Sequence, residues 1–296
     1  MTRQTDKLCA ILSAGRLQVM PCCWDALSAK MIEQAGFPVT FMSGFAVAAA
    51  RIGAPDTGLI SYGEIADQAR NICAAVSIPV IGDGDTGYGN ALNVRRTVQG
   101  YARAGCAAIM IEDQLAPKRC GHTKGKLVVS REEALERVQA AVDAREEGSD
   151  ILILARTDAR ATHGLDEAIW RAQQFSRIGA DILFVEAPRD EAEMARVPRE
   201  APGAHMANMV EGGATPLLPP AKLEELGFAL AAYPLTLMSA AMKAMKESLQ
   251  AFGQGRHPAD RVMDFAELRA IVGFDDYYDA EVRYAASNRD KPKAAE

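Results

Sequence analysis

The chain has 296 residues and a net charge of −6, with 49% hydrophobic and 24% charged residues. This composition is typical of a globular protein, and the acidic balance without a basic stripe argues against binding to nucleic acid or to an acidic membrane surface. No apolar run approaches the length of a membrane span and residues 1–12 lack a signal-peptide core, so we expect a cytoplasmic protein. The six cysteines form no Cys-x-x-Cys pair, which indicates free thiols rather than zinc ligands.

Short apolar runs of strand type recur along the chain. In order they are 17–21, 39–42, 78–81, 107–111, 151–155, 182–185, 205–209 and 228–232. Helical patterns separate them, among them 24–35, 62–76, 91–104, 131–147 and 165–178. The strict alternation of eight strands with helices predicts an α/β fold, a (β/α)8 barrel of the TIM type, which commonly takes about 250 residues in one domain.

Three more helical patterns follow the eighth predicted strand, at 238–252, 265–271 and 277–286. A barrel needs only one closing helix, so this tail is longer than the fold requires. We therefore divide the chain into a barrel over 1–237 and a C-terminal helical extension over 238–296. We expect the extension to belong to the same domain and to pack on a neighbouring subunit.

Two acids follow the third predicted strand, in the stretch VIGDGDTGYGN over 80–90. Asp83 and Asp85 are one residue apart on a glycine-rich turn, where two carboxylates repel each other unless a cation or water lies between them. Ligation by oxygen alone suits Mg²⁺ or Mn²⁺ better than zinc. The same residues could equally be turn and N-cap residues, because acids and glycines are common at both.

Polar residues follow the other predicted strands as well. In a barrel these strand ends meet on one face, where enzymes of this fold carry their chemistry. Acids, an arginine and an amide therefore converge there, which strengthens the prediction of a metal-dependent site. The residues are Asp25, Ser43, Glu112, Asp113, Arg156, Thr157, Asp158, Glu186, Asn208, Glu211, Tyr233 and Thr236.

The connection after the fourth strand is long, basic and glycine-rich, and reads KRCGHTKGK over 118–126. Such a loop is typical of a mobile lid. The cations and the imidazole of His122 beside Cys120 would favour the reactive thiolate and proton transfer near neutral pH. From composition alone, a solvated basic loop with an inert cysteine is the simpler interpretation.

The segment Lys118 to His122 resembles the signature loop of the isocitrate lyase and phosphoenolpyruvate mutase superfamily. The resemblance extends over nearly the whole chain, and its motifs stand in the same order. They are Ser43-Gly44, Pro55-Asp56, the stretch 83–89, Glu112-Asp113-Gln114, Arg156-Thr157-Asp158, Glu186-Ala187-Pro188 and Asn208. The resemblance implies a magnesium-dependent barrel that acts on α-oxy dicarboxylates. It also implies a homotetramer, a dimer of dimers in which a C-terminal helix is exchanged between subunits.

Departures from particular branches narrow the activity. Phosphonate-forming mutases have Asn-Ser where this chain has Cys120-Gly121, whereas members with a cysteine there are similar to carbon–carbon lyases. The 2-methylisocitrate lyases have Gly-Gly where this chain has Gly44-Phe45, Thr or Ser where it has Met209 and Val210, and an arginine near Phe265 that is missing. These departures remove groups that would bind a third carboxylate. The stretches 43–45, 233–236 and 273–278 instead resemble the branch that cleaves 2-alkylmalates, 2,3-dimethylmalate and oxaloacetate.

The resemblance thus implies a lyase that cleaves the C2–C3 bond of a 2-hydroxy dicarboxylate, such as 2,3-dimethylmalate, to pyruvate or a related 2-oxo acid and a carboxylate. It assigns Mg²⁺, with Mn²⁺ as a substitute, to Asp85 directly and to Asp83, Glu112 and Asp56 through water. Proton donation falls to Cys120, and Arg156, His122 and Asn208 would stabilise the carbanion. Glu186 would orient Arg156 or His122. The expected substrate-binding residues are Ser43, Gly44, Phe45, Gly121, Asn208, Pro234 and Thr236.

Several alternatives stay open. Oxaloacetate hydrolysis or decarboxylation uses the same enolate-type stabilisation, so the motifs barely separate it from alkylmalate cleavage. A 2-methylisocitrate lyase and a phosphonomutase acting on phosphoenolpyruvate are disfavoured by the departures above. A Schiff-base aldolase would need a lysine on a strand, but Lys118 lies on a loop. A barrel that binds without catalysis is disfavoured by the intact acids and Cys120.

Overall fold

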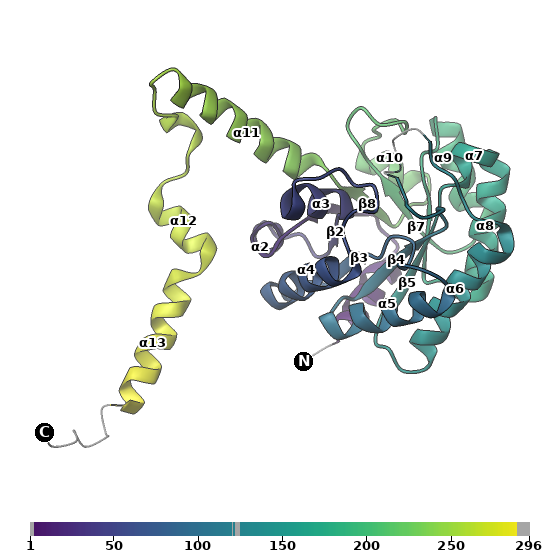
Figure 1. Ribbon diagram of the computed structural model, residues 1–296, viewed down its shortest axis with the longest axis horizontal. Coiled ribbons are helices and arrows are strands. Elements are labelled where there is room, and N and C mark those ends of the chain that lie inside the picture. The colour runs from purple at the N-terminus through teal and green to yellow at the C-terminus, as the bar shows by residue number, and fades with distance from the viewer. Residues whose placement is uncertain (1–2, 120, 122–124, 289–296) are drawn as a thin grey trace, which may run out of the picture. The chain divides into compact units, whose positions relative to one another are not determined.

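The computed structural model describes residues 3–119, 121 and 125–288 (Figure 1). Its parallel strands close into a barrel in the order β1 to β8, and β1 pairs with β8 through the register Gln18 opposite Leu230. The strands are β1 (Gln18–Cys23), β2 (Thr40–Met42), β3 (Val80–Asp83), β4 (Ala108–Glu112), β5 (Leu152–Thr157), β6 (Ile182–Val185), β7 (Ala204–Asn208) and β8 (Leu230–Tyr233). Each overlaps a predicted strand, and the (β/α)8 barrel is confirmed.

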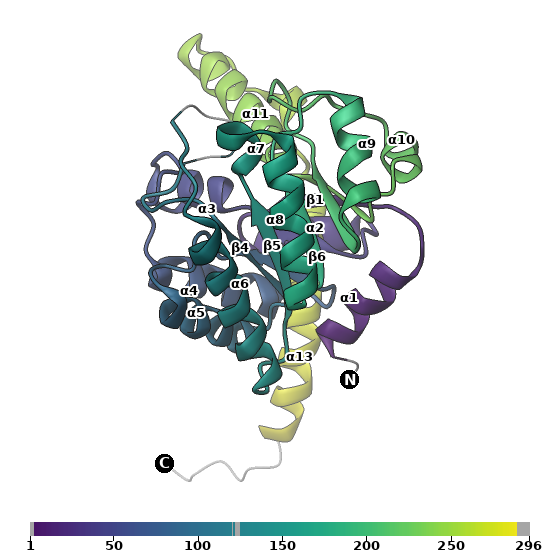
Figure 2. The same ribbon diagram turned by 90° about the vertical axis from the view of Figure 1, so that its right-hand side faces the viewer.

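Helices alternate with the strands around the outside, as α6 and α8 over β4 to β6 illustrate (Figure 2). Those of the barrel are α1 (Gln4–Ser13), α2 (Ala26–Gln34), α3 (Gly44–Ile52), α4 (Tyr62–Ala75), α5 (Ala91–Ala104), α6 (Arg131–Glu146), α7 (Ala159–His163), α8 (Leu165–Ile178), α9 (Glu191–Glu200) and α10 (Pro220–Glu225). Sequence periodicity did not predict α3, which begins directly after β2 and matters for the site.

Local sequence signals set several helix boundaries. Helix α2 begins two residues later than predicted because Asp25 is its N-cap and accepts a hydrogen bond from the Ser28 amide. Helices α5 and α8 end at Gly105 and Gly179, whose φ values of 97° and 111° lie in the left-handed region that glycine adopts without a Cβ clash. Each glycine turns the chain toward the following strand.

Apolar side chains fill the inside of the barrel and the layer between strands and helices. The inner cluster includes Met20, Phe41, Met110, Phe184 and Met206, which come from five different strands. Leu8 of α1 is fully buried in the same cluster, so α1 covers the amino ends of the strands. The carboxyl ends remain available for a site, as the fold leads one to expect.

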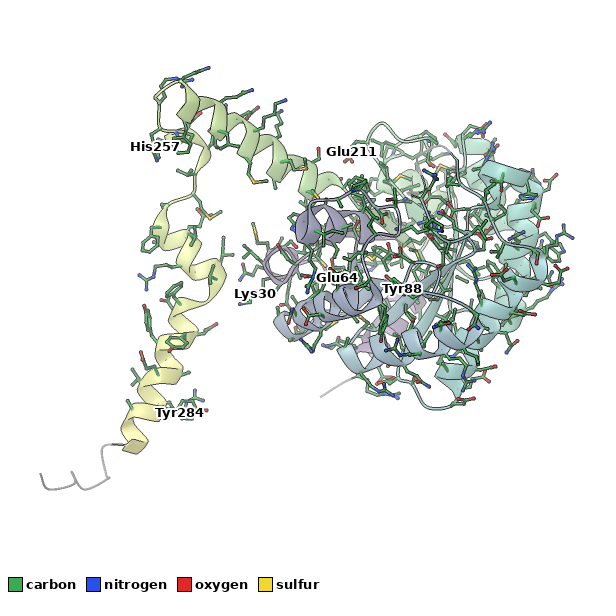
Figure 3. The ribbon with its side chains drawn as sticks, viewed as in Figure 1. Lys30, Glu64, Tyr88, Glu211, His257 and Tyr284 are labelled. Carbon is green, nitrogen blue, oxygen red and sulfur yellow. The ribbon has the colours of Figure 1, made fainter. Side chains whose placement is uncertain are left out.

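The chain divides into two compact units, Met1–Ala240 and Ala241–Glu296. Helix α11 (Thr236–Gly253) crosses the boundary, and the second unit continues with the 3₁₀ helix η1 (Ala259–Arg261), α12 (Phe265–Val272) and α13 (Phe274–Asn288). This unit exposes many large apolar side chains, including Tyr284 on α13 (Figure 3). In the described part of the chain, no helix combines the length and apolar character needed to cross a membrane.

Candidate active site

A cavity of ≈ 220 Å³ lies at the carboxyl ends of the strands. Its polar lining comes from loops and strand ends, and its apolar lining comes from β2, β4, β6, β7 and β8, from α3 and from the loops after β7 and β8. The lining residues are Phe41, Ser43, Phe45, Asp56, Asp83, Met110, Glu112, Lys118, Arg119, Gly121, Arg156, Phe184, Glu186, Met206, Asn208, Val210, Ala232, Pro234 and Leu235.

The end of β3 presents its two acids in a constrained turn. Asp85 has φ 47°, a left-handed conformation that is costly for a residue with a Cβ and is typical of functional sites. Its Oδ2 accepts a hydrogen bond from the Tyr88 hydroxyl at 3.0 Å. The Tyr101 hydroxyl donates to the carbonyl of Asp83 at 2.5 Å, and the Asp85 amide donates to Asp83 Oδ1. The turn is therefore held from both sides.

Helix α3 begins at the edge of this acid pair. Ser43 is its N-cap, with Oγ accepting from the Ala46 amide, and the Gly44 amide donates to Asp83 Oδ2 at 3.1 Å. A Cβ on Gly44 would lie only 2.5 Å from that oxygen. Glycine is needed here so that the backbone can approach the carboxylate, which also lies at the positive end of the helix dipole.

Lys118 lies among the acids. Its Nζ is 2.7 Å from Asp85 Oδ1 and also pairs with Asp56 Oδ1, and all three side chains are at most 7% exposed. Burial acts to lower the pKa of Lys118, but the surrounding carboxylates outweigh it and raise that pKa well above its ordinary value. The positive charge of the Lys118 ammonium therefore balances part of the negative charge of Asp56 and Asp85.

The acids nevertheless have too little positive charge around them. Burial, and then the charge of Asp85, raises the pKa of Asp83 to about 6. Burial likewise raises the pKa of Glu112 well above its ordinary value and that of Asp56 to a smaller extent. Such shifts mean that the ionised forms would gain from a further cation.

Arg156, at the end of β5, joins the acids to the rest of the site. Asp158 holds its guanidinium through two hydrogen bonds, Nε to Oδ2 at 2.8 Å and Nη2 to Oδ1 at 3.0 Å. The same guanidinium lies 3.4 Å from Glu112 Oε2 and 3.2 Å from Glu186 Oε2. A planar group held in this bidentate way has a fixed orientation toward the cavity.

Glu186 connects Arg156 with Asn208, whose Nδ2 donates to Glu186 Oε2 at 3.1 Å. The next residue, Ala187, has φ 59° and donates its amide to Glu186 Oε1. Gly121 lies directly over this group, because a Cβ there would be 2.5 Å from Arg156 Nη2 and 2.6 Å from Glu186 Oε2. The β4–α6 loop, residues 113–130, therefore reaches the site through its described part.

Most of the residues predicted for the site come together around this one cavity. Phe45, Pro234 and the other lining residues surround it, but Thr236 is not among them, and its hydroxyl instead donates to Glu211, which Figure 3 labels. Gly44 and Asp85 do not line the cavity either, and Lys118 contacts the Asp85 carboxylate. Cys120 and His122 lie outside the described residues.

Sequence reasoning missed several residues that support the site. The sequence by itself assigns no individual role to Asp158, Lys126 or Tyr88. It presents Lys118 as a cation beside Cys120 and as a Schiff-base candidate, but not as a partner of the acids. The contacts of the two lysines depend on partners distant in sequence, such as Lys126 with Asp158 at 3.4 Å. For Lys118, Tyr88 and Asp158, presence in family-like motifs was the signal that could have pointed to them.

The buried carboxylate oxygens of the site are possible ligands for a metal ion. Glu112 Oε1 is buried without a hydrogen-bond partner among the described residues, whereas Asp56 Oδ1 and Asp85 Oδ1 face the Lys118 ammonium. Oxygen ligands of this kind suit a hard divalent cation. The described His, Cys, Asp and Glu residues do not yet form a group of three spaced to hold an ion. The ligand chemistry therefore fits, while Lys118 occupies two of the acids.

Comparison with known proteins agrees with the fold. A family model for phosphoenolpyruvate phosphomutase matches residues 8–252. The chain is 43% identical over 282 residues to the 2,3-dimethylmalate lyase of Eubacterium barkeri, covering 94% of this chain and 97% of that one. It is 39% identical over 269 residues to a 2-methylisocitrate lyase of Aeropyrum pernix, covering 89% and 86%.

Solved structures with high similarity to this chain have related names. A crystal structure of 2,3-dimethylmalate lyase, a member of the PEP mutase/isocitrate lyase superfamily, has a TM-score of 0.91 at 34% identity and covers 100% of both chains. Oxaloacetate acetylhydrolase with 3,3-difluorooxalacetate has a TM-score of 0.92 at 33% identity, covering 95% and 97%. Phosphonopyruvate hydrolase with oxalate and Mg²⁺ has a TM-score of 0.84 at 29% identity, covering 96% and 100%. The chain therefore belongs to the phosphoenolpyruvate mutase/isocitrate lyase superfamily, as a carbon–carbon lyase.

Proposed function

We propose that this lyase cleaves the C2–C3 bond of a 2-alkylmalate, such as 2,3-dimethylmalate, to a 2-oxo acid and a carboxylate, and that it requires Mg²⁺. The observation that carries the proposal is one cavity lined both by buried acids, such as Asp83 and Glu112, and by apolar side chains, among them Met206 and Ala232. A dicarboxylate with an alkyl substituent has the matching chemistry. The 43% identity to a 2,3-dimethylmalate lyase supports the same substrate.

The metal would be held by Asp85, Asp83, Glu112 and Asp56. Counting formal charges favours a divalent ion at these acids. Six buried carboxylates (these four with Asp158 and Glu186) lie beside three buried cations, Lys118, Lys126 and Arg156, and the exposed Arg119 also lines the cavity. When bound, the ion would act as a Lewis acid that makes the substrate's 2-hydroxyl easier to deprotonate. Phosphonopyruvate hydrolase, solved with oxalate and Mg²⁺, supports this assignment.

The chain's own residues would handle the charge that develops on the substrate. As the C2–C3 bond breaks, its electron pair passes to C3 and the adjacent carboxylate. Arg156 and Asn208 face the cavity as donors to that carboxylate, and Glu186 holds both in place. Cys120 would then protonate C3 and would recover over the cycle the proton lost from the 2-hydroxyl. His122 would assist as a donor.

The 2-oxo half and the alkyl group of the substrate would contact other residues in and around the cavity. Ser43, Gly44 and Phe45 at the start of α3, together with Gly121, would bind the 2-oxo half. Phe45 and Pro234 would contact the alkyl group. Thr236 would act from outside this wall, since its hydroxyl contacts Glu211. Val210 also lines the wall, so this part of the site offers apolar surface where a third carboxylate would need a donor.

The test is release of pyruvate (glyoxylate in the case of isocitrate) from a panel of 2,3-dimethylmalate, 2-methylisocitrate, isocitrate and oxaloacetate, with Mg²⁺ and with EDTA. We expect Mg²⁺-dependent release from the alkylmalate and loss of most activity in Cys120→Ser. Cys9→Ser is the matched control, because Cys9 is an exposed free thiol. Turnover of 2-methylisocitrate in preference to the alkylmalate would contradict the proposed substrate.

A second candidate is oxaloacetate hydrolysis. It is favoured by the likeness to oxaloacetate acetylhydrolase, which matches 95% of this chain. The same cation-lined side would stabilise the enolate-type charge of that reaction. Acetate and oxalate released from oxaloacetate, with no turnover of the alkylmalate, would establish this alternative.

The second unit supports a proposal about assembly. Its helices expose apolar side chains on α11 and α12, among them Met242, Met245, Leu249 and Phe265, each 57–73% exposed. Exposed apolar surface of this extent is typical of an interaction site. We propose that it is covered in a homotetramer, a dimer of dimers with exchanged C-terminal helices. Light scattering should give four times the chain mass, and Leu249→Asp should lower that mass.

A further inference from the structure

The β4–α6 loop is attached at its base by paired backbone. The Leu115 amide donates to Leu127 at 2.8 Å and the Val129 amide to Asp113 at 2.9 Å. Gln114 exchanges two hydrogen bonds of 2.9 Å with the backbone of Arg119. These contacts fix where the loop leaves and rejoins the barrel.

Lys126, in the part of the loop that leads back to the barrel, attaches the loop through its side chain. Its side chain is 5% exposed, and its Nζ donates to the carbonyl of Gly121. The same Nζ lies 3.4 Å from Asp158 Oδ1, the oxygen that also accepts from Arg156 Nη2. One carboxylate oxygen is thus shared by a loop lysine and a site arginine.

Asp158 is itself held firmly. Its side chain is fully buried, and its amide donates to Asp113 Oδ1 at 2.9 Å. Asp113 in turn accepts from the Thr157 hydroxyl at 2.6 Å and from Arg171 of α8 at 3.0 Å. Because the anchor is rigid, a charge-assisted contact to it can position whatever it holds.

We propose that Lys126 is a positioning residue that uses Asp158 to hold the Gly121 backbone against Arg156 and Glu186. Lys126 does not line the cavity, so it acts through other residues rather than on the substrate. The contact attaches the loop to the same rigid carboxylate that orients Arg156, so the seated loop is in register with the arginine. For catalysis, the inference rests on the proposed function, since it assumes that Arg156 acts on the substrate.

The first test measures seating of the loop without any turnover. Trypsin cleavage after Arg119 is followed by mass spectrometry in wild type and in Lys126→Met. Loss of a charge-assisted hydrogen bond should speed this cleavage about tenfold. Lys126→Arg should restore most of the protection. Lys222→Met is the matched control, because Lys222 pairs with Glu191 and Glu225 on the surface and its loss also removes one trypsin site.

A double-variant cycle tests the route through Asp158. If Lys126 acts through this carboxylate, Lys126→Met combined with Asp158→Asn should be cleaved no faster than Asp158→Asn alone. The proposal would be overturned if the two substitutions raised the cleavage rate by factors that multiply in the double variant. An unchanged cleavage rate in Lys126→Met, or a faster rate explained by a lower melting temperature, would also overturn it.

Kinetics provide the functional readout. With the turned-over substrate, Lys126→Met should lower kcat about tenfold, because fewer molecules have Arg156 and the loop in register, while Mg²⁺ affinity stays unchanged. Faster cleavage with unchanged kcat would overturn the coupling between loop and arginine. A wrong substrate assignment would leave the proteolysis result intact, so the two failures can be told apart.

Discussion

The two sides of the cavity are stabilised in opposite ways. The acidic side consists of Asp56, Asp83 and Glu112, with Asp85 next to them. Its carboxylates crowd together, Glu112 Oε1 has no hydrogen-bond partner among the described residues, and Asp85 has a left-handed backbone. The apolar side consists of Phe184, Met206, Val210, Ala232 and Leu235. The acidic side stores unfavourable electrostatics that a cation can relieve, whereas the apolar side is held by ordinary packing. We expect the first to determine whether the reaction occurs and the second to determine which substrate reacts.

The largest effect should come from Gly44→Ala on the acidic side. The new methyl group would lie 2.5 Å from Asp83 Oδ2 and would displace either α3 or the acid. We expect activity to fall at least about 100-fold, with a stability loss of about 1–3 kcal/mol for the overpacking. Gly63→Ala is the matched control, since a Cβ there meets its nearest atom at 3.9 Å. Activity near wild type would show that the acidic side tolerates displacement.

On the apolar side, Ala232→Leu should change substrate preference instead. Ala232 lines the cavity from β8, and a larger side chain would take the space of the alkyl group. We expect kcat/KM for 2,3-dimethylmalate to fall about 50-fold, within the range for methylene-sized changes, with a smaller loss for an unsubstituted malate or oxaloacetate. An equal loss for all substrates would mean that the wall does not select the substituent.

A third variant, Lys118→Met, probes the charge balance of the acidic side. The Lys118 ammonium pairs with Asp56 and Asp85, so it competes with a divalent cation for their oxygens. Mg²⁺ binding to the substrate-free protein, measured by calorimetry, should tighten about tenfold without it. Lys7→Met on α1 should leave the affinity unchanged. Weaker binding would show that Lys118 supports the metal site.

The smallest effect concerns His205, on β7 beneath the apolar side. It is fully buried, its Nε2 lies 2.7 Å from the Ala201 carbonyl, and burial lowers its pKa. The unfolded chain therefore binds a proton more readily below about pH 6.5, so stability is present above that pH and declines as the pH falls.

We expect His205→Gln to lose less free energy of unfolding between pH 7 and pH 5 than wild type does. The difference should be about 1.4 kcal/mol for each unit by which the pKa is lowered. Urea titrations at both pH values measure it, with His163→Gln on the surface as control. Parallel pH dependence of wild type and His205→Gln would exclude His205 as a source of acid sensitivity.

Much of the architecture could be predicted from local patterns. The eight strand positions follow from apolar runs, and the boundaries of α5 and α8 follow from periodicity and from Gly105 and Gly179. Helix α3 escaped prediction because residues 44–50 are all apolar or glycine and so show no polar face, and three of its first five residues are fully buried.

The candidate site likewise combines features that the sequence predicts with contacts that only the folded structure creates. The sequence by itself determined that acids, an arginine and an amide end neighbouring parallel strands, because strand ends in a barrel must meet. Only the tertiary structure decided that Lys118 pairs with Asp56 and Asp85, that Thr236 contacts Glu211, and that Lys126 shares Asp158 with Arg156. These contacts join residues up to 62 positions apart in the case of Lys118 and Asp56. Their geometry depends on how a loop packs on the barrel, which no local pattern encodes.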